Sequence, residues 1–69
     1  MKFEVVRFKV ADKEFSLLTK VAIIDDYGFT LVCNSLDEAF KVSYAYNRSN
    51  LLTHISHGDL GYTVRVDKK

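Results

Sequence analysis

Hydrophobic and polar residues recur along this chain with two different periods, and one stretch has the period of a helix. Over residues 34–47, a rotation of about 100° per residue separates a mostly apolar arc from a mostly charged one. The apolar arc holds Leu36, Ala39, Phe40, Ser43, Tyr46 and Asn47, and the opposite arc holds Asp37, Glu38, Lys41, Ala45 and Arg48. Ser35 and Glu38 have the spacing of a capping box, in which each side chain accepts a hydrogen bond from a helix-start amide. The pattern predicts a helix over residues 34–47, closed by a left-handed Asn47 or Asn50.

Five other stretches are rich in β-branched and aromatic residues and are separated by short polar breaks, as is typical of strands. They are residues 2–10, 15–24, 29–33, 51–56 and 62–67. In the first stretch, the apolar phase changes between Val5 and Val6, which predicts a β-bulge there or partial burial on both faces. Asp25, Asp26 and Gly28 predict a turn, because Asp side chains bond local amides and glycine tolerates positive φ. Residues 57–61, with two glycines, predict a hairpin loop.

The order of these elements, β-β-β-α-β-β, predicts one small α+β domain spanning residues 1–69. In this fold a mostly antiparallel sheet of about five strands packs on one helix. The predicted core consists of Phe3 or Phe8, Phe15, Leu17, Val21, Ile23, Phe29, Leu31, Leu36, Phe40, Tyr46, Ile55, Tyr62, Val64 and Val66. One helix can cover only one face of such a sheet. The other face and the edge strands are therefore expected to be available for a partner chain or a second copy.

Composition narrows the possible functions. The 69 residues contain one cysteine, Cys33, which excludes an internal disulfide and a cysteine-based zinc framework. The net charge of +1, with both signs interleaved, argues against an acidic DNA mimic and against binding to phosphate backbone through bulk charge. The apolar runs are too short to span a membrane, and no signal-peptide segment is recognisable. We therefore expect a cytoplasmic protein.

Residues 54–59 contain the densest group of chemically reactive side chains. His54, His57 and Asp59 would suit a metal ion or an acid–base pair if the two imidazoles converged. A His-x-x-His spacing alone is weak evidence, and a surface loop explains the same residues. Cys33 in an apolar strand is typical of a small buried hydrophobe rather than a nucleophile. We therefore predict no enzymatic activity, no metal and no cofactor.

A second group of residues suits the binding of a macromolecule. Tyr44 and Arg48, with Lys41 one turn earlier, could stack on nucleic-acid bases or anchor a protein interface. The near-zero net charge favours protein over nucleic acid. The predicted partner-binding residues are Tyr44, Arg48, Lys41, Tyr27, His57 and Asp59.

Three features resemble the Dmd-type phage antitoxins, very small proteins that inhibit bacterial ribonuclease toxins of the RnlA and LsoA type. They are a Val-rich first strand, Thr19-Lys20 followed shortly by Asp25-Asp26, and a late helix before a terminal strand. The small size and the absence of enzyme motifs also resemble other phage host-takeover proteins, including anti-CRISPR proteins. This resemblance implies a phage protein that blocks a bacterial host or defence protein by steric occlusion in the bacterial cytoplasm.

The leading hypothesis is therefore a small non-enzymatic inhibitor or adaptor that binds a protein. The alternative is a small nucleic-acid-binding regulatory module. A homodimer is compatible with either hypothesis, because the uncovered sheet face and the lack of disulfide or metal both favour self-association.

Overall fold

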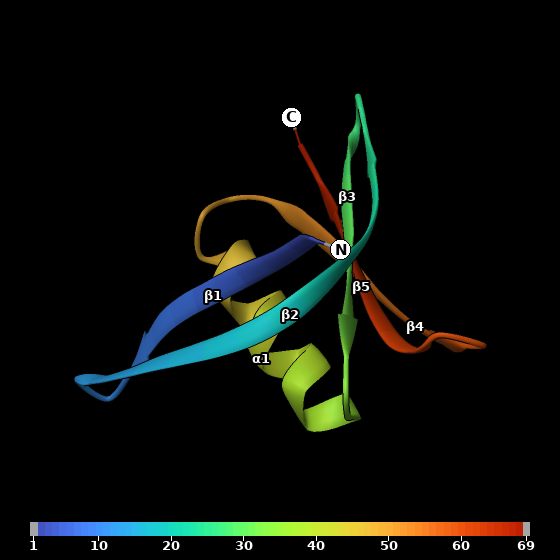
Figure 1. Cartoon of the computed structure of the whole chain (residues 1–69). Coiled ribbons are helices and arrows are strands. Elements are labelled where there is room, and N and C mark those ends of the chain that lie inside the picture. The colour runs from blue at the N-terminus through green and yellow to red at the C-terminus, as the bar shows by residue number, and fades with distance from the viewer. Residues whose placement is uncertain (1, 69) are drawn as a thin grey trace.

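The chain folds into a twisted five-stranded sheet with one helix against one of its faces (Figure 1). The computed structural model describes residues 2–68. Its elements are β1 (Lys2–Val10), β2 (Lys13–Asp25), β3 (Gly28–Cys33), α1 (Leu36–Asn47), β4 (Leu52–Gly58) and β5 (Gly61–Asp67). All neighbouring strands are antiparallel, so the predicted α+β fold is confirmed.

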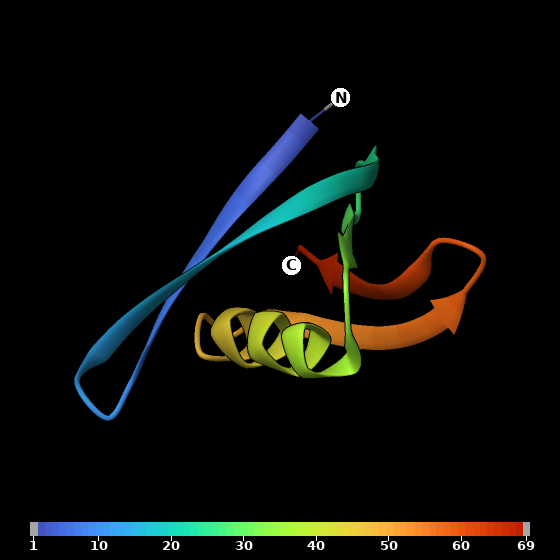
Figure 2. The same cartoon turned by 60° about the horizontal axis from the view of Figure 1, so that its bottom comes forward.

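The strands lie side by side in the order β1-β2-β3-β5-β4, which differs from their order along the chain. After β3, the chain crosses the sheet through α1, forms β4 at the edge, and returns as β5 to pair with β3. The sheet twists strongly, so the β1–β2 hairpin and the β4–β5 hairpin point in different directions (Figure 2). As a result, α1 lies mainly over β4 and β5.

The turns follow the local chemistry of their residues. Asp25 Oδ1 accepts hydrogen bonds from the amides of Tyr27 (2.8 Å) and Gly28 (3.0 Å), which confirms the turn predicted there. At Gly28 a Cβ atom would collide with the backbone carbonyl of Val66, so only glycine lets β3 lie this close to β5. The β4–β5 turn is shorter than the predicted 57–61 loop, because Gly58 already pairs with Gly61.

The helix begins at the predicted cap with one difference. Ser35 Oγ accepts from the amide of Glu38 at 3.2 Å, as expected for a capping box. The Glu38 carboxylate accepts from the amide of Asn34 at 3.3 Å, whereas a capping box would have it accept from the amide of Ser35. At the other end, Asn50 has φ of 64°, which is the predicted left-handed asparagine after the helix.

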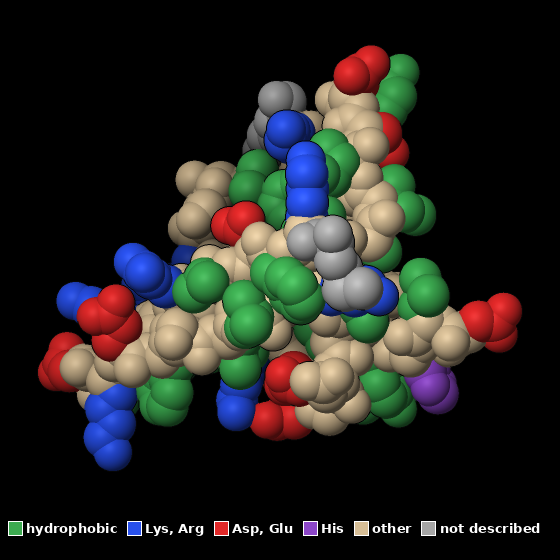
Figure 3. Space-filling view, viewed as in Figure 1, with side chains coloured by type: hydrophobic (Ala, Val, Ile, Leu, Met, Phe, Trp, Pro, Cys, Tyr) green, Lys and Arg blue, Asp and Glu red, His purple; other side chains and the backbone are tan. Residues whose placement is uncertain are grey.

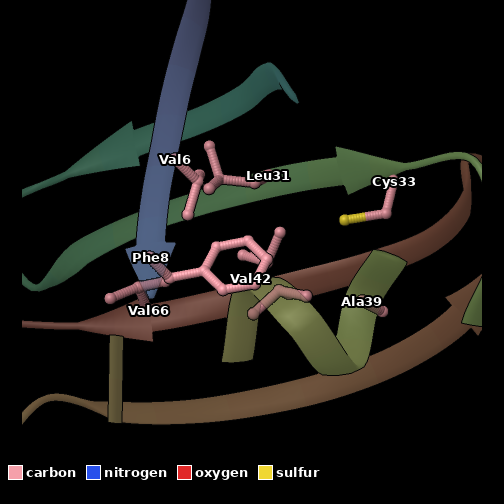
Figure 4. Packing of buried hydrophobic residues seen from close by; sticks show 8 residues of the cluster. Val6, Phe8, Leu31, Cys33, Ala39, Val42 and Val66 are labelled. Carbon is pink, nitrogen blue, oxygen red and sulfur yellow. The ribbon is translucent and has the colours of Figure 1, made fainter. Parts of the chain in front are cut away.

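The core lies between α1 and the sheet face formed by β1, β3 and β5 (Figure 4). Its buried hydrophobic residues are Val6, Phe8, Leu31, Cys33, Ala39, Val42, Val64 and Val66. Thr19 is buried among them, and its hydroxyl donates to the backbone carbonyl of Glu4 at 2.9 Å. This bond satisfies the one buried polar side chain among the described residues.

Of the two alternatives Phe3 and Phe8, Phe8 is the residue buried in the core. Four other residues predicted for the core are exposed instead, namely Phe15, Ile23, Leu36 and Phe40. Phe15 does face the helix side, where its ring stacks on Phe8, but it lies close to the β1–β2 turn. For Ile23, the cause is the position of the bulge. The pairing of β1 with β2 is unbroken through Val5 and Val6, and the register shift lies between Val21 and Ile23 of β2. In the helix, the small side chains of Ala39 and Val42 face the sheet, which turns Leu36 and Phe40 away from it.

Candidate functional site

The six predicted partner-binding residues lie in three separate places. Tyr27 is at the β2–β3 turn and is 77% exposed, whereas His57 and Asp59 are at the β4–β5 turn. These turns lie at opposite ends of the sheet, because Gly28 pairs with Asp67 and Cys33 pairs with Tyr62. Of the other three residues, Lys41 and Tyr44 are on α1, and Arg48 is its C-cap. The structure therefore does not bring all six residues together.

Tyr44 and Arg48 form a pair on the exposed side of α1, as their spacing of four residues allows. Arg48 Nη1 donates to the Tyr44 hydroxyl at 3.1 Å, and its guanidinium carbon lies 5.7 Å from the centre of the ring. Lys41 instead contacts Asp37, four residues earlier on the helix, at 2.8 Å. This surface thus presents the Tyr44–Arg48 pair, and the charge of the nearby Lys41 is balanced by Asp37.

The two histidines face opposite sides of the sheet. His57 stacks on Tyr62 on the helix side, with ring centres 4.2 Å apart. His54 lies on the other side, and its Nε2 is 3.6 Å from Asp67 Oδ2. The hypothesis that both imidazoles converge on one ligand is therefore wrong. Among residues 2–68, no group of three or more His, Cys, Asp or Glu side chains could hold a metal ion.

Cys33 is buried in the core, as its apolar strand predicted. Removal from water, together with the nearby charge of Glu38, raises the pKa of its thiol to about 11. The reactive thiolate is therefore scarce at neutral pH. Burial and the charge of Glu4 likewise raise the pKa of the Tyr46 hydroxyl.

Tyr46 also lines a small pocket between the C-terminal part of α1 and the sheet. The pocket has a volume of about 280 Å³ and is lined by Glu4, Val21, Ile24, Phe29, Tyr46 and Lys68. Sites for small molecules are usually about 300–1,000 Å³. This pocket falls just below that range.

The sheet face that α1 does not cover, here called the open face, carries an apolar cluster. Phe3, Val5, Leu18 and Ile23 are between 47% and 63% exposed on this face, and together we call them the open-face patch. Val5 lies directly opposite Leu18 across β1 and β2. Figure 3 shows hydrophobic side chains gathered over these two strands.

The other half of the open face is charged. Arg65 of β5 donates to Asp25 of β2 at 2.8 Å and to Asp67 at 3.2 Å, and Asp67 in turn lies near His54. The hydrogen bond from Arg65, with others from the Tyr27 and Gly28 amides, lowers the pKa of the Asp25 carboxyl. The charged groups on this half pair with one another, whereas the large side chains of the patch remain exposed.

Sequence reasoning predicted an available second face but did not identify the patch. Ile23 was expected in the core and Phe3 was one of two alternatives for it, and only the two-sided apolar pattern around Val5 and Val6 indicated otherwise. Comparison with protein-family models, curated proteins and solved structures found no match for this chain. Within residues 2–68, no helix is both long enough and apolar enough to cross a membrane.

Proposed function

We propose that this chain is a small non-enzymatic inhibitor or adaptor that binds another protein and blocks part of its surface. The observation that carries the proposal is the open-face patch, in which four large apolar side chains of β1 and β2 are exposed on the same face of the sheet. Large apolar side chains exposed on one face are a feature of interaction surfaces. A sheet face is also a rigid platform, so little conformational freedom is lost when a partner binds.

The charges around the patch indicate the chemistry of the partner. Lys20 lies opposite Phe3, and Arg7 lies two residues beyond Val5 on the same face. An apolar surface bordered by acidic side chains would complement this arrangement. The resemblance to Dmd-type antitoxins supports a bacterial host or defence protein as the partner, met in the cytoplasm.

A matched pair of substitutions tests the patch. Leu18 in the patch is 63% exposed, and Leu60 in the β4–β5 turn is 60% exposed. Tagged wild-type, Leu18→Lys and Leu60→Lys proteins are incubated with bacterial lysate, and retained proteins are identified by mass spectrometry. We expect a near-stoichiometric partner to be retained by wild type and Leu60→Lys and lost by Leu18→Lys. Equal retention by both variants would remove the patch as the binding surface.

The helix residues give a second comparison in the same experiment. Tyr44→Ala/Arg48→Ala removes the tyrosine–arginine pair while leaving the patch intact. Loss of the partner from this variant, with retention by Leu18→Lys, would assign binding to α1 instead. Nuclease treatment tests the nucleic-acid alternative. If the amount of retained protein drops after nuclease treatment and falls steeply with salt concentration, the chain is a nucleic-acid-binding module.

A further inference from the structure

The two edge strands of the sheet differ in charge. β1 carries Lys2, Glu4, Arg7 and Lys9, and such charges oppose pairing with another strand. β4 has the sequence LTHISHG and contains no Asp, Glu, Lys or Arg. In this respect it resembles β3, the strand in the middle of the sheet. β4 is therefore the edge that lacks protection against pairing.

The hydrogen-bonding groups that point outward from β4 follow from its hairpin. Gly58 and Gly61 flank a two-residue turn, so they exchange backbone hydrogen bonds, and bonded pairs then alternate along the ladder. Ser56, His54 and Leu52 therefore bond toward β5. The N–H and C=O groups of Thr53, Ile55 and His57 point away from the sheet, and no strand formed by residues 2–68 lies beside them.

The side of α1 nearest β4 is apolar in its first half. Ser43 and Asn47 of α1 both form hydrogen bonds with Thr53 of β4. These two residues therefore identify the side of the helix that faces β4. Leu36 and Phe40 precede these two residues by seven positions, so they lie on the same stripe of the helix. They are 42% and 58% exposed, so they form an apolar ridge above the unprotected edge.

We propose that two copies of this chain form a dimer through β4, joining their sheets into one antiparallel sheet of ten strands. Antiparallel pairing by a twofold axis perpendicular to the sheet puts both helices on the same face. All seven residues of β4 are paired when Ile55 lies on the axis, and Thr53, Ile55 and His57 then make about six backbone hydrogen bonds with the partner copy.

The helices fit the same symmetry. α1 lies over β4 and β5, and neighbouring strands are about 4.8 Å apart, so the two helix axes would be about 10 Å apart. This matches the usual spacing of about 8–10 Å between packed helices. The apolar ridges formed by Leu36 and Phe40 would then meet across the axis. A second copy is the occupant that presents both a matching uncharged strand and a matching ridge.

Disulfide trapping tests the register. With Ile55 on the axis, His54 of one copy lies opposite Ser56 of the other in a pair without hydrogen bonds, where the Cα atoms are about 4.5 Å apart. This distance suits a disulfide. We therefore expect an equimolar mixture of His54→Cys and Ser56→Cys proteins to form a disulfide-linked dimer on mild oxidation. Each variant alone places its two new thiols diagonally, about 7–8 Å apart, and should link much less.

Solution mass tests the interface itself. By light scattering at micromolar concentrations, we expect wild type at twice the 7.9 kDa mass of the chain. Phe40→Lys should shift the protein to monomer by placing a charge in the ridge. His57→Pro should do the same by removing an outward N–H, whereas His57→Ala keeps that N–H and should remain dimeric. Circular dichroism of each variant checks that it is folded.

The proposal is overturned by a wild-type protein that is monomeric up to millimolar concentration, or by a dimer that survives both Phe40→Lys and His57→Pro. It is independent of the proposed function, since β4 pairing leaves both open-face patches uncovered. Leu18→Lys should therefore lose the protein partner and remain dimeric. Phe40→Lys should become monomeric and still bind that partner, although more weakly if the target is itself symmetric.

Discussion

At the scale of single residues, a few contacts decide how closely the strands approach. Gly28 sits at the end of β3, where the backbone of Val66 leaves no room for a side chain. Gly58, at the end of β4, faces open space, because a Cβ atom placed there would meet nothing within 4 Å beyond its chain neighbours. A side chain is therefore excluded at Gly28 and has room at Gly58.

Gly28→Ala should therefore destabilise the fold by about 3 kcal/mol, because β3 and β5 must separate to admit the new methyl group. Gly58→Ala is the matched control and should change the free energy of unfolding by less than about 0.5 kcal/mol. Urea denaturation followed by circular dichroism measures both values. Similar values for the two variants would contradict the close approach at Gly28.

The ion pair of Asp25 with Arg65 should make stability depend on pH. Because the pKa of Asp25 is lowered below its ordinary value of 3.8 by folding, this carboxylate stabilises the protein above that pH. The stabilisation is lost as the pH falls through the lower pKa of the folded state. Asp25→Asn should therefore flatten the acid side of the stability profile, measured as urea midpoints from about pH 5 to pH 2. Asp26→Asn, which removes a carboxylate without an ion pair among residues 2–68, should keep the wild-type slope.

At the scale of elements, local signals were sufficient to place the helix and all five strands. The Ser35–Glu38 spacing located the helix start, and the side chain of Ser35 does accept a hydrogen bond from the Glu38 amide. The orientation of each strand was harder to predict. Ile23 faces the open side because β2 shifts register against β3 after Val21, and this shift is a property of the pairing between the two strands. Alternation within β2 alone could not reveal it.

Ser35→Ala should reduce the free energy of unfolding by about 1 kcal/mol, since the Glu38 amide loses its acceptor at the start of α1. Ser49→Ala, in the exposed turn that follows α1, is the control and should stay within about 0.5 kcal/mol of wild type. Thermal or urea unfolding distinguishes the two. Equal effects would show that the cap contributes little to the stability of this helix.

At the scale of the whole molecule, the small core leaves a large apolar surface in contact with water. Of the residues that the structure describes, eight hydrophobic ones are buried, whereas Phe3, Leu18, Ile23, Phe40 and others are more than half exposed. The candidate site was therefore predictable only in general terms. The sequence indicated that one helix cannot cover both sheet faces. Which apolar residues stay uncovered depends on the twist of the sheet and on where α1 rests.

Dimerisation through β4 would make thermal stability depend on concentration, because the folded dimer dissociates as it unfolds. With about 0.7 kcal/mol of unfolding enthalpy per residue in each chain, Tm should rise by about 5 °C for each tenfold increase in protein concentration. Calorimetry across a hundredfold range of concentration measures this slope. Phe40→Lys should show almost no slope, and a wild-type Tm that is independent of concentration would contradict the dimer.

The buried thiol of Cys33 allows the rate of unfolding to be measured by alkylation. The chain has a single cysteine, so every alkylation event reports on one position. β3 is paired on both sides, and Cys33 lies beneath α1, so a reagent reaches the sulfur only when the strands and the helix come apart. In a pulse-labelling experiment, the rate of mass gain would follow the opening of the core around Cys33. No added dye, tag or mutation is needed to time it.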